Sequence, residues 1–202
     1  MNDLIATFIF FFAVIDPIGT IPVFIAVTRS YDAPTRRRIA VRATLTAALI
    51  LVFFVIAGAL ILTALAIPLA AFQIAGGIVL FLFALTMIFG EGKPEEEVRL
   101  AQSGHETAIF PLAVPSIASP GAMLAAVLLT ENNRYNLVEQ AMTTAVMLAV
   151  LVLVLVLMLA ANVLYRLIGD SGASIISRVM GMILASLAVT SVLAGIKDYF
   201  AL

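Results

Sequence analysis

The run Asp16-Pro17-Ile18-Gly19 interrupts a stretch of apolar residues long enough to cross a bilayer, and Ser119-Pro120-Gly121 interrupts a second such stretch. Aspartate and serine are preferred helix N-caps, and proline is favoured at the first helical position because its missing N–H needs no partner there. Each run therefore predicts a helix that starts again inside a membrane span. In transporters such breaks commonly mark the binding site, because broken backbone at membrane depth must face protein or a water-filled cavity.

The composition is that of a membrane protein. Of the 202 residues 63% are hydrophobic and only 11% are charged, and the mean hydropathy is +1.18. A transmembrane helix needs about 20 mostly apolar residues. We predict an all-α fold, a six-span transmembrane bundle in one membrane domain (1–202), with the first segment retained as a span. The spans are expected near 3–28, 40–63, 67–90, 107–130, 138–165 and 174–198.

Basic residues gather on one side of this bundle. Only Arg134 and Lys197 fall on the other side. Cationic residues are retained on the cytoplasmic side, so the first, third and fifth connections should face the cytoplasm and both termini should face the periplasm or cell exterior. The residues that carry this prediction are Arg29, Arg36, Arg37, Arg38, Arg42, Lys93, Arg99, Arg166 and Arg178.

Several kinds of chemistry find no support in the sequence. There is no cysteine, and the one histidine, His105, lies in a polar linker. No basic stripe with interleaved aromatic residues occurs, and no Gly-rich phosphate loop ends in Lys-Ser or Lys-Thr. We therefore expect no metal ion, no cofactor, no nucleic-acid partner and no catalytic residues, and we do not expect an enzyme. The lipid bilayer is the expected surrounding, and a homo-oligomer is left open.

The middle of the chain contains the main linker. Residues 91–106 combine helix breakers with a short acidic run, and we expect them to form a solvated cytoplasmic linker or, as the alternative, a docking surface for a partner. The linker separates repeat one, about 1–90, from repeat two, about 107–202. Because each repeat holds three spans, the second enters the membrane with opposite polarity, as in the inverted repeats of many secondary transporters.

Weak internal similarity supports this division. A shift of 103 positions places Asp16-Pro17 on Ser119-Pro120. A shift of 104 places Gly77, Leu80, Ala84 and Thr86 on Gly181, Leu184, Ala188 and Thr190. Apolar helices share such residues by chance, so the matched cap-proline-glycine elements carry most of the weight. The prediction is two inverted three-helix repeats with broken first and fourth helices.

Asp16 is an acidic residue near the middle of the first span, where an ionised side chain costs at least about 2.5 to 3.5 kcal/mol. It can cap the following helix, bind a cation or a substrate ammonium, or carry a proton. Two opposed half-helix N-termini favour an anion such as a carboxylate. A small zwitterionic solute, with protons as a further partner, satisfies both requirements. The predicted substrate-binding residues are Asp16, Pro17, Gly19, Thr20, Ser119, Pro120 and Gly121.

A second group of residues is expected to serve packing or gating. Small residues within spans usually form helix contact surfaces, whereas prolines kink helices or line gates. An asparagine in the fifth span can bond across helices or face a cavity. The residues of this group are Pro22, Gly76, Gly77, Pro111, Pro115, Asn162 and Gly181.

Three motifs resemble those of the MarC family of bacterial inner-membrane proteins: the run 16–22, the run 73–78 and the series Pro111, Pro115, Ser119-Pro120-Gly121. The resemblance covers essentially the whole chain and implies six spans, outward-facing termini and kinship with the lysine-exporter superfamily. It also implies small neutral amino acids such as glycine and alanine as substrates. Many relatives have Gly-Pro-Gly at the second break, where this chain has Ser119. The functional residues that the resemblance implies are Asp16, Pro17, Gly19, Pro22, Pro115, Ser119, Pro120 and Gly121.

The sequence thus favours a secondary transporter or exporter of small solutes, most of all small neutral amino acids, that works by alternating access at a midplane site in the cell inner membrane. The alternatives are a non-transporting membrane protein with a stress or regulatory role, in which the acidic linker would be the contact surface, and a membrane enzyme that processes lipid. The enzyme is less favoured because such chemistry usually needs clustered acids, histidines or a metal.

Overall fold

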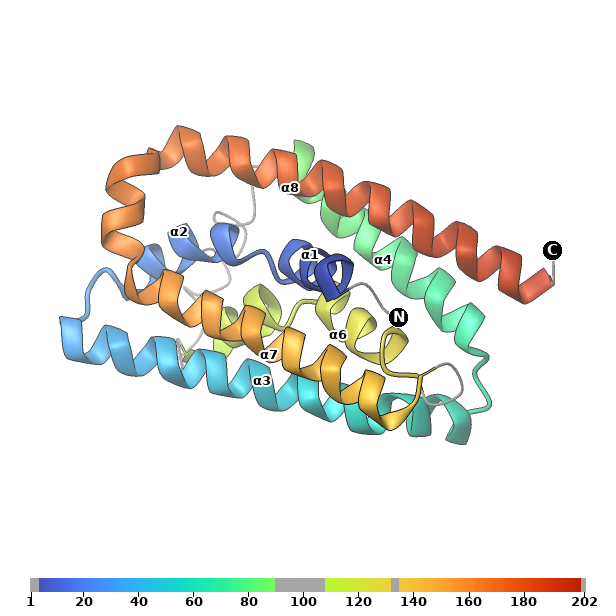
Figure 1. Cartoon of the computed structure of the whole chain (residues 1–202). Coiled ribbons are helices and arrows are strands. Elements are labelled where there is room, and N and C mark those ends of the chain that lie inside the picture. Colours follow the sequence, from blue (N-terminus) through green and yellow to red (C-terminus); the bar gives the residue numbers. More distant parts are fainter. Residues whose placement is uncertain (1–3, 90–107, 132–134, 201–202) are drawn as a thin grey trace.

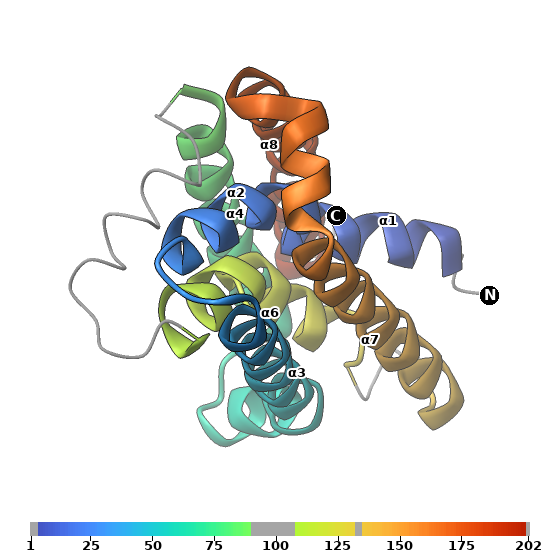
Figure 2. The ribbon, with the colours of Figure 1, turned by 90° about the vertical axis from the view of Figure 1, so that its left-hand side faces the viewer.

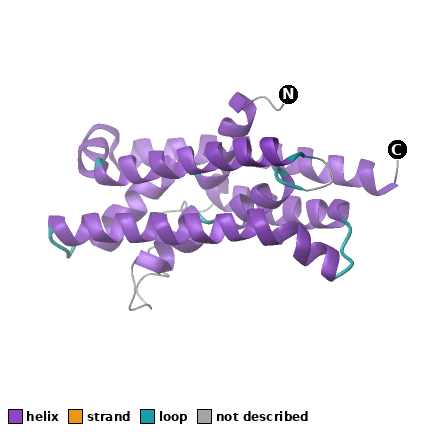
Figure 3. Cartoon of the chain, turned by 60° about the horizontal axis from the view of Figure 1, so that its bottom comes forward, coloured by secondary structure: helices purple, strands orange, loops and turns teal. Residues whose placement is uncertain are grey.

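The computed structural model describes residues 4–89, 108–131 and 135–200. These ranges are helical apart from short connections and from Phe110 and Val114, whose backbone is extended (φ −128°, ψ 124° and φ −136°, ψ 127°), and no strand occurs in them (Figure 3). The predicted linker 91–106, with Lys93, Arg99 and His105, and also Arg134, lie outside the described residues. The elements are α1 (Leu4–Ile15), α2 (Pro17–Thr28), α3 (Ala33–Ala64), α4 (Leu69–Phe89), the π-helix η1 (Ala108–Ile117), α6 (Pro120–Leu128), α7 (Leu137–Leu159) and α8 (Ala161–Phe200).

Five helical segments are long and apolar enough to cross a membrane, and a sixth is bent. The five are Leu4–Thr28, Ala33–Ala64, Leu69–Phe89, Leu137–Leu159 and Ser174–Phe200. The sixth combines Phe110–Ile117 with Pro120–Leu128, which meet at an angle of 50°. The structure confirms an all-helical protein with five or six candidate spans, and it interrupts the first and fourth segments where the two Pro motifs lie.

Helix ends differ from the expected span ends where polar residues continue a helix. Helix α3, which contains the second expected span, begins at Ala33 rather than near residue 40, because arginines are good helix formers and Pro34 occupies the first turn. Helix α7, which contains the fifth, ends at Leu159 instead of reaching residue 165. The last helix extends back to Ala161 and turns at Gly169, whose φ of 64° suits a residue without a Cβ. Hydropathy marks membrane depth and does not mark where a helix ends.

The short helices form the middle of the bundle. In Figures 1 and 2, α1, α2 and α6 lie between the α4–α8 pair on one side and α3 and α7 on the other. The contacts agree, because α6 packs on both α3 and α4 while α2 packs on both α7 and α8. Both termini lie toward one end of the bundle in Figure 1, and the α2–α3 connection lies at the opposite end. The two breaks are thus surrounded by the long helices.

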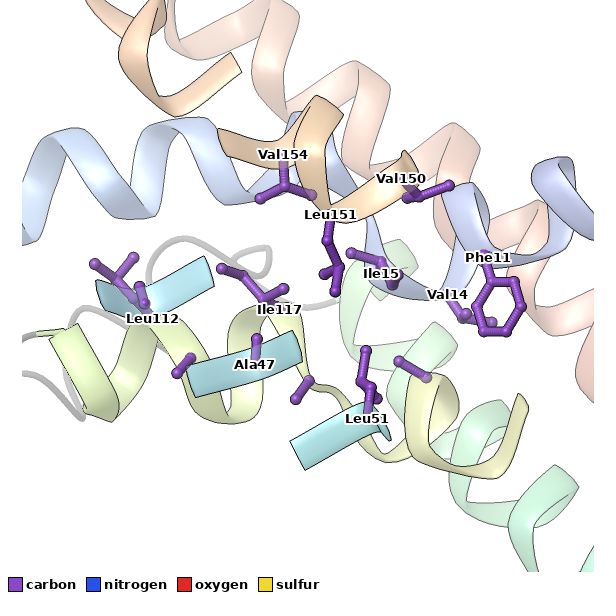
Figure 4. Close-up of a cluster of buried hydrophobic side chains, with 14 of the residues drawn as sticks. Phe11, Val14, Ile15, Ala47, Leu51, Leu112, Ile117, Val150, Leu151 and Val154 are labelled. Carbon is purple, nitrogen blue, oxygen red and sulfur yellow. The ribbon is translucent and has the colours of Figure 1, made fainter. Parts of the chain in front are cut away.

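The apolar core gathers around the breaks. Figure 4 shows side chains from α1, α3, η1 and α7 that meet in this region. All are buried, and because lipid tails are as apolar as these side chains, close packing stabilises the helix contacts more than a hydrophobic driving force does. The labelled members are Phe11, Val14, Ile15, Ala47, Leu51, Leu112, Ile117, Val150, Leu151 and Val154.

Helices α4 and α8 form a close antiparallel pair along a seam of small residues. A Cβ built on Gly181 would lie 3.0 Å from the carbonyl oxygen of Ala84, and one on Gly77 would lie 3.0 Å from that of Ala188. Gly195 stands in the same relation, also at 3.0 Å, to Ala70. The seam residues recur every seven positions on both helices. The two backbones therefore approach as closely as glycine permits.

The outward-facing surfaces of the long helices are apolar. On α3, Leu45, Leu49 and Ile56 are 63%, 74% and 66% exposed. A contiguous exposed apolar surface of this kind marks contact with a membrane rather than with water. The core and the outer surface are both apolar, as expected of helices that have protein on one face and lipid on the other.

Candidate functional site

The first break lies at Asp16, with twelve helical residues on either side in α1 and α2. Its backbone adopts the left-handed conformation, φ 51° and ψ 68°, which aspartate tolerates better than most residues. The Oδ1 atom of Asp16 accepts a 3.0 Å hydrogen bond from the Gly19 N–H, and the Thr20 hydroxyl donates to the Asp16 carbonyl at 3.1 Å. Asp16 is only 1% exposed. The predicted cap is present, and it places a carboxylate inside the protein.

Gly19 leaves room for this carboxylate. A Cβ built on Gly19 would lie 2.0 Å from Oδ2 and 2.8 Å from Cγ of Asp16. Non-bonded contacts of a Cβ atom under 3.0 Å essentially do not occur, so any other residue at this position would displace the Asp16 side chain. Pro17, buried at the first position of α2, provides the restart of the helix. The glycine and the proline therefore hold the acid in place.

The second break lies at Ser119 and is built differently. Ser119 has extended backbone, and its Oγ accepts a 3.2 Å bond from the Ala122 N–H as the N-cap of α6. The same hydroxyl donates a 2.8 Å bond to the Val14 carbonyl near the end of α1. Ser119 is fully buried, whereas Pro120 is exposed. The Ser119 hydroxyl therefore caps α6 at the second break and also donates a hydrogen bond to a carbonyl beside the first break.

The two breaks are in direct contact. Besides the bond from Ser119 to Val14, the hydroxyls of Thr20 and Ser116 lie 3.3 Å apart, and either can be the donor. A Cβ on Gly121 would be 3.6 Å from that of Val14 and 2.4 Å from the Leu80 side chain. Helix α2 thus runs beside η1, and α1 runs beside α6. The sequence indicates Ser116 as one of the small residues around the second break, but it contains no local signal for a partner 96 positions away.

This arrangement has a defined chemical character. The N–H groups of a first helical turn lack partners within their own helix, and each helix N-terminus carries about half a positive charge. The start of α6 is bonded to the end of α1 two residues before Asp16, and the first turn of α2 contacts η1, so both helix starts lie near the carboxylate of Asp16 and the hydroxyls of Thr20, Ser116 and Ser119. The site can therefore receive an anionic group at the helix starts and a cationic group at Asp16. Across the described ranges, no cluster of His, Asp and Glu has the makings of a metal site.

Most residues predicted to serve packing or gating lie at helix contacts. Gly76 faces Leu124 of α6, while Gly77 and Gly181 belong to the α4–α8 seam. Pro22 lies inside α2 and is half-buried. Pro111 and Pro115 lie within η1, and each follows a cis peptide bond. Gly76, Gly77 and Gly181 therefore all lie where a neighbouring helix packs closely against them.

Asn162 differs from its expected place. It lies beyond α7, at the start of α8, and it is exposed. Its Oδ1 accepts a 3.0 Å bond from Nη2 of Arg36 on α3. The expected span was too long because residues 160–165 remain fairly apolar after the helix has already ended. Asn162 therefore joins two helices near one end of the bundle, away from the breaks.

The fold and the two broken segments define an integral membrane protein of the helical-bundle class. The chain belongs to the MarC family of integral membrane proteins, whose profile matches residues 1–200. It is 32% identical over 197 residues to the UPF0056 inner membrane protein YhgN of Escherichia coli K12, with 98% of each chain covered. It is 35% identical over 200 residues to a UPF0056 membrane protein of Methanocaldococcus jannaschii, covering 98% of this chain and 97% of the other.

A UPF0056 membrane protein of Buchnera aphidicola from Schizaphis graminum is 32% identical over 201 residues, with 99% of each chain covered. No solved structure matches the chain. The family assignment agrees with the resemblance drawn from the Pro motifs, and the matches extend over both halves of the chain. The names of these relatives describe membrane proteins and state no substrate.

Proposed function

We propose that this protein is a secondary transporter of small solutes whose substrate site lies where the two breaks meet. One observation carries the proposal: a buried carboxylate at the midpoint of the first span contacts the start of α2, and the capped start of α6 is bonded to the end of α1. Broken spans that meet at half depth are the usual binding sites of such transporters. Alternating access around this point would expose it to each side in turn.

The burial pattern supports an inverted repeat within the proposed transporter. The buried positions of α4 are Gln73, Gly77, Leu80, Ala84 and Met87. Shifted by 104 positions they fall on five buried positions of α8, namely Ser177, Gly181, Leu184, Ala188 and Ser191. Because α4 and α8 run antiparallel, equivalent residues lie at opposite ends of one seam.

The helix contacts support the same symmetry. Exchanging the repeats converts the contact of Gly77 with Ala188 into that of Gly181 with Ala84, and both are present. It likewise relates the α2–α7 pair to the α6–α3 pair, and the α2–α8 pair to the α6–α4 pair. Two buried atoms are related in the same way: Gln73 Oε1 and Ser177 Oγ both lack a hydrogen-bond partner among the residues that the structure describes. A pseudo-two-fold axis through the seam accounts for all these observations.

We propose that the arginine-rich end of α3 faces the cytoplasm and that both termini face outward. Arg29, Arg37, Arg38 and Arg42 are exposed at this end, and the termini lie toward the other end in Figure 1. Basic residues are retained on the cytoplasmic side. An inner-membrane location is consistent with the name of the relative YhgN.

We infer that the substrate is a small zwitterion such as a small neutral amino acid. Its carboxylate would bind at the helix N-termini and its ammonium at Asp16. The residues at the breaks are small, and Thr20, Ser116 and Ser119 are fully buried, which favours a solute of a few heavy atoms. Asp16 is also the group best placed to carry a proton, because it is the acid at the centre of the first span.

Purified protein in liposomes tests the proposal. Labelled alanine, glycine and serine are supplied on one side, with and without a pH gradient, and uptake is compared with protein-free liposomes. Asp16→Asn retains the cap, because asparagine caps helices as well as aspartate does. Loss of the ammonium contact should lower flux by about tenfold or more. No flux across a broad panel of solutes would contradict the transporter and favour the regulatory alternative.

A further inference from the structure

A small polar cavity lies apart from the breaks, at the end of the bundle that carries the arginines. It has a volume of about 140 Å³ and is formed where α2, α3, the end of α7 and the start of α8 meet. Neither Asp16 nor Ser119 belongs to it. Its lining residues are Phe24, Ala33, Arg36, Arg37, Met158, Leu159 and Asn162. The cavity is therefore separate from the proposed transport site.

Arg36 is held in a defined position within this cavity. Its Nη2 donates a 3.0 Å bond to Asn162 Oδ1, and its guanidinium lies 5.7 Å from the centre of the Phe24 ring. A guanidinium has five N–H donors in a planar fork that matches the oxygens of a phosphate. The bond to Asn162 and the contact with Phe24 already restrict the Arg36 side chain, so a ligand that binds there loses less free energy in ordering it. Arg36 is thus a preorganised donor for an anion.

The charge of the lining is one-sided. Arg37 provides a second guanidinium, and none of the described residues that line the cavity is acidic. Asp32, the N-cap of α3, is exposed and makes no side-chain cap bond. The start of α3 adds a partial positive charge to the same region. An anion with a phosphate group therefore suits the cavity better than a cation or a neutral solute.

The surroundings indicate where the anion comes from. Leu159, which lines the cavity, is 51% exposed, and Val163 at the start of α8 is 64% exposed. On α3, Val41 and Leu45 follow Arg37 at helical spacing and are also exposed. A phosphate bound between Arg36 and Arg37 would therefore have apolar, membrane-facing side chains directly below it. Acyl chains can cover such a surface, whereas free phosphate leaves it in contact with other lipids.

We propose that this cavity binds the phosphate of an anionic phospholipid from the leaflet on the arginine-rich side. Basic pockets between helices at this depth recognise lipid headgroups in other membrane proteins. The bound lipid would join α2, α3 and α8 at the point where Arg36 already bonds to Asn162. This inference does not depend on transport, because the cavity lies apart from the two breaks.

Lipid binding to the purified full-length protein in detergent tests the proposal. Native mass spectrometry measures the affinity for phosphatidylglycerol and for phosphatidylcholine with the same acyl chains, and we expect phosphatidylglycerol to bind more tightly. The variant R36Q/R37Q should bind phosphatidylglycerol about thirtyfold more weakly. The matched control R38Q/R42Q removes the same charge from exposed positions outside the cavity, and it should change the affinity by less than about twofold. Equal losses in the two double variants would overturn the proposal.

Two further measurements keep the result interpretable. Asn162→Asp adds a carboxylate beside Arg36 and should weaken phosphatidylglycerol binding even if the arginine variants fail to fold, whereas Asn162→Ser should retain most of it. Unchanged binding of phosphatidylglycerol to Asn162→Asp would overturn the site.

Millimolar inorganic phosphate is then added to the wild-type protein as a competitor of the lipid. Failure of phosphate to displace the lipid supports a headgroup site, whereas complete displacement would assign the cavity to free phosphate and overturn the lipid proposal.

Discussion

The hydroxyl of Ser119 donates a 2.8 Å hydrogen bond to the carbonyl of Val14 and at the same time accepts one of 3.2 Å from the Ala122 N–H. Val14 lies in the last turn of α1, where carbonyl groups have no partner within the helix. The same side chain therefore satisfies an acceptor at one break and a donor at the other. In a membrane, where water is absent, each of these groups would otherwise be costly.

Ser119→Ala should therefore destabilise the protein more than an ordinary cap loss. Removing a cap costs about 1 kcal/mol, and a buried carbonyl without its donor costs about 1–3 kcal/mol. Unfolding of the purified protein in mixed detergent micelles measures the sum. The control is Ser186→Ala, since that exposed hydroxyl bonds to the Met182 carbonyl of its own helix. A change at Ser119 no larger than at Ser186 would contradict the dual role.

Gly19 and Asp16 should show strong coupling in a double-mutant cycle. Gly19→Ala forces the Asp16 carboxylate from its place, and crowding of this kind costs about 1–3 kcal/mol. In an Asp16→Gly background the obstacle is gone, and Gly19→Ala should be neutral or stabilise α2 by up to about 1 kcal/mol. Asp16→Gly itself suits the left-handed backbone at this position. Additive effects of the two substitutions would show that the contact between them is unimportant.

Alanine at the seam glycines should separate α4 from α8. An added Cβ at Gly77 or Gly181 would lie 3.0 Å from a carbonyl oxygen and within 2.7 or 2.9 Å of side-chain carbons. We expect each substitution to cost about 1–3 kcal/mol in detergent unfolding. Ala75→Val is the matched control, because Ala75 lies on the same helix with its side chain exposed. Equal stability of the Gly77 and Ala75 variants would argue against tight packing at the seam.

Ser177→Ala should stabilise the protein. Ser177 is 1% exposed, and within the described part of the chain its Oγ has no hydrogen-bond partner. A buried polar group without a partner costs about 1–3 kcal/mol, so its removal should raise the free energy of unfolding by about 1 kcal/mol. Thr190→Val serves as control, since the Thr190 hydroxyl bonds to the Ser186 carbonyl and is exposed. Destabilisation by Ser177→Ala would show that the hydroxyl has a partner in solution.

A flux measurement on the same variant separates stability from transport. If the hydroxyl of Ser177 finds a partner in another conformation of the proposed cycle, Ser177→Ala would be more stable and yet slower. Unchanged flux would limit the role of Ser177 to this one conformation. Gln73, which occupies the equivalent position under the proposed repeat, provides an independent second site for the same comparison.

The sequence alone determined the class of protein and the positions of its breaks. Long apolar stretches can satisfy their backbone groups in lipid only as helices. Aspartate or serine before proline fixes a helix start by local chemistry, so Asp16 and Ser119 could be recognised without any partner. The capping bonds to Gly19 and Ala122 lie within three residues of each cap, and the structure contains both.

Only the tertiary structure decided which of these residues meet. The bonds of Thr20 with Ser116, Ser119 with Val14 and Arg36 with Asn162 join positions 96, 105 and 126 residues apart. Hydropathy cannot reveal them, because a helix in lipid is apolar on its buried face and on its outer face alike. Which face of a helix packs on protein and which faces lipid depends on small residues such as Gly77 and Gly181. Their effect appears only when a second helix lies against them.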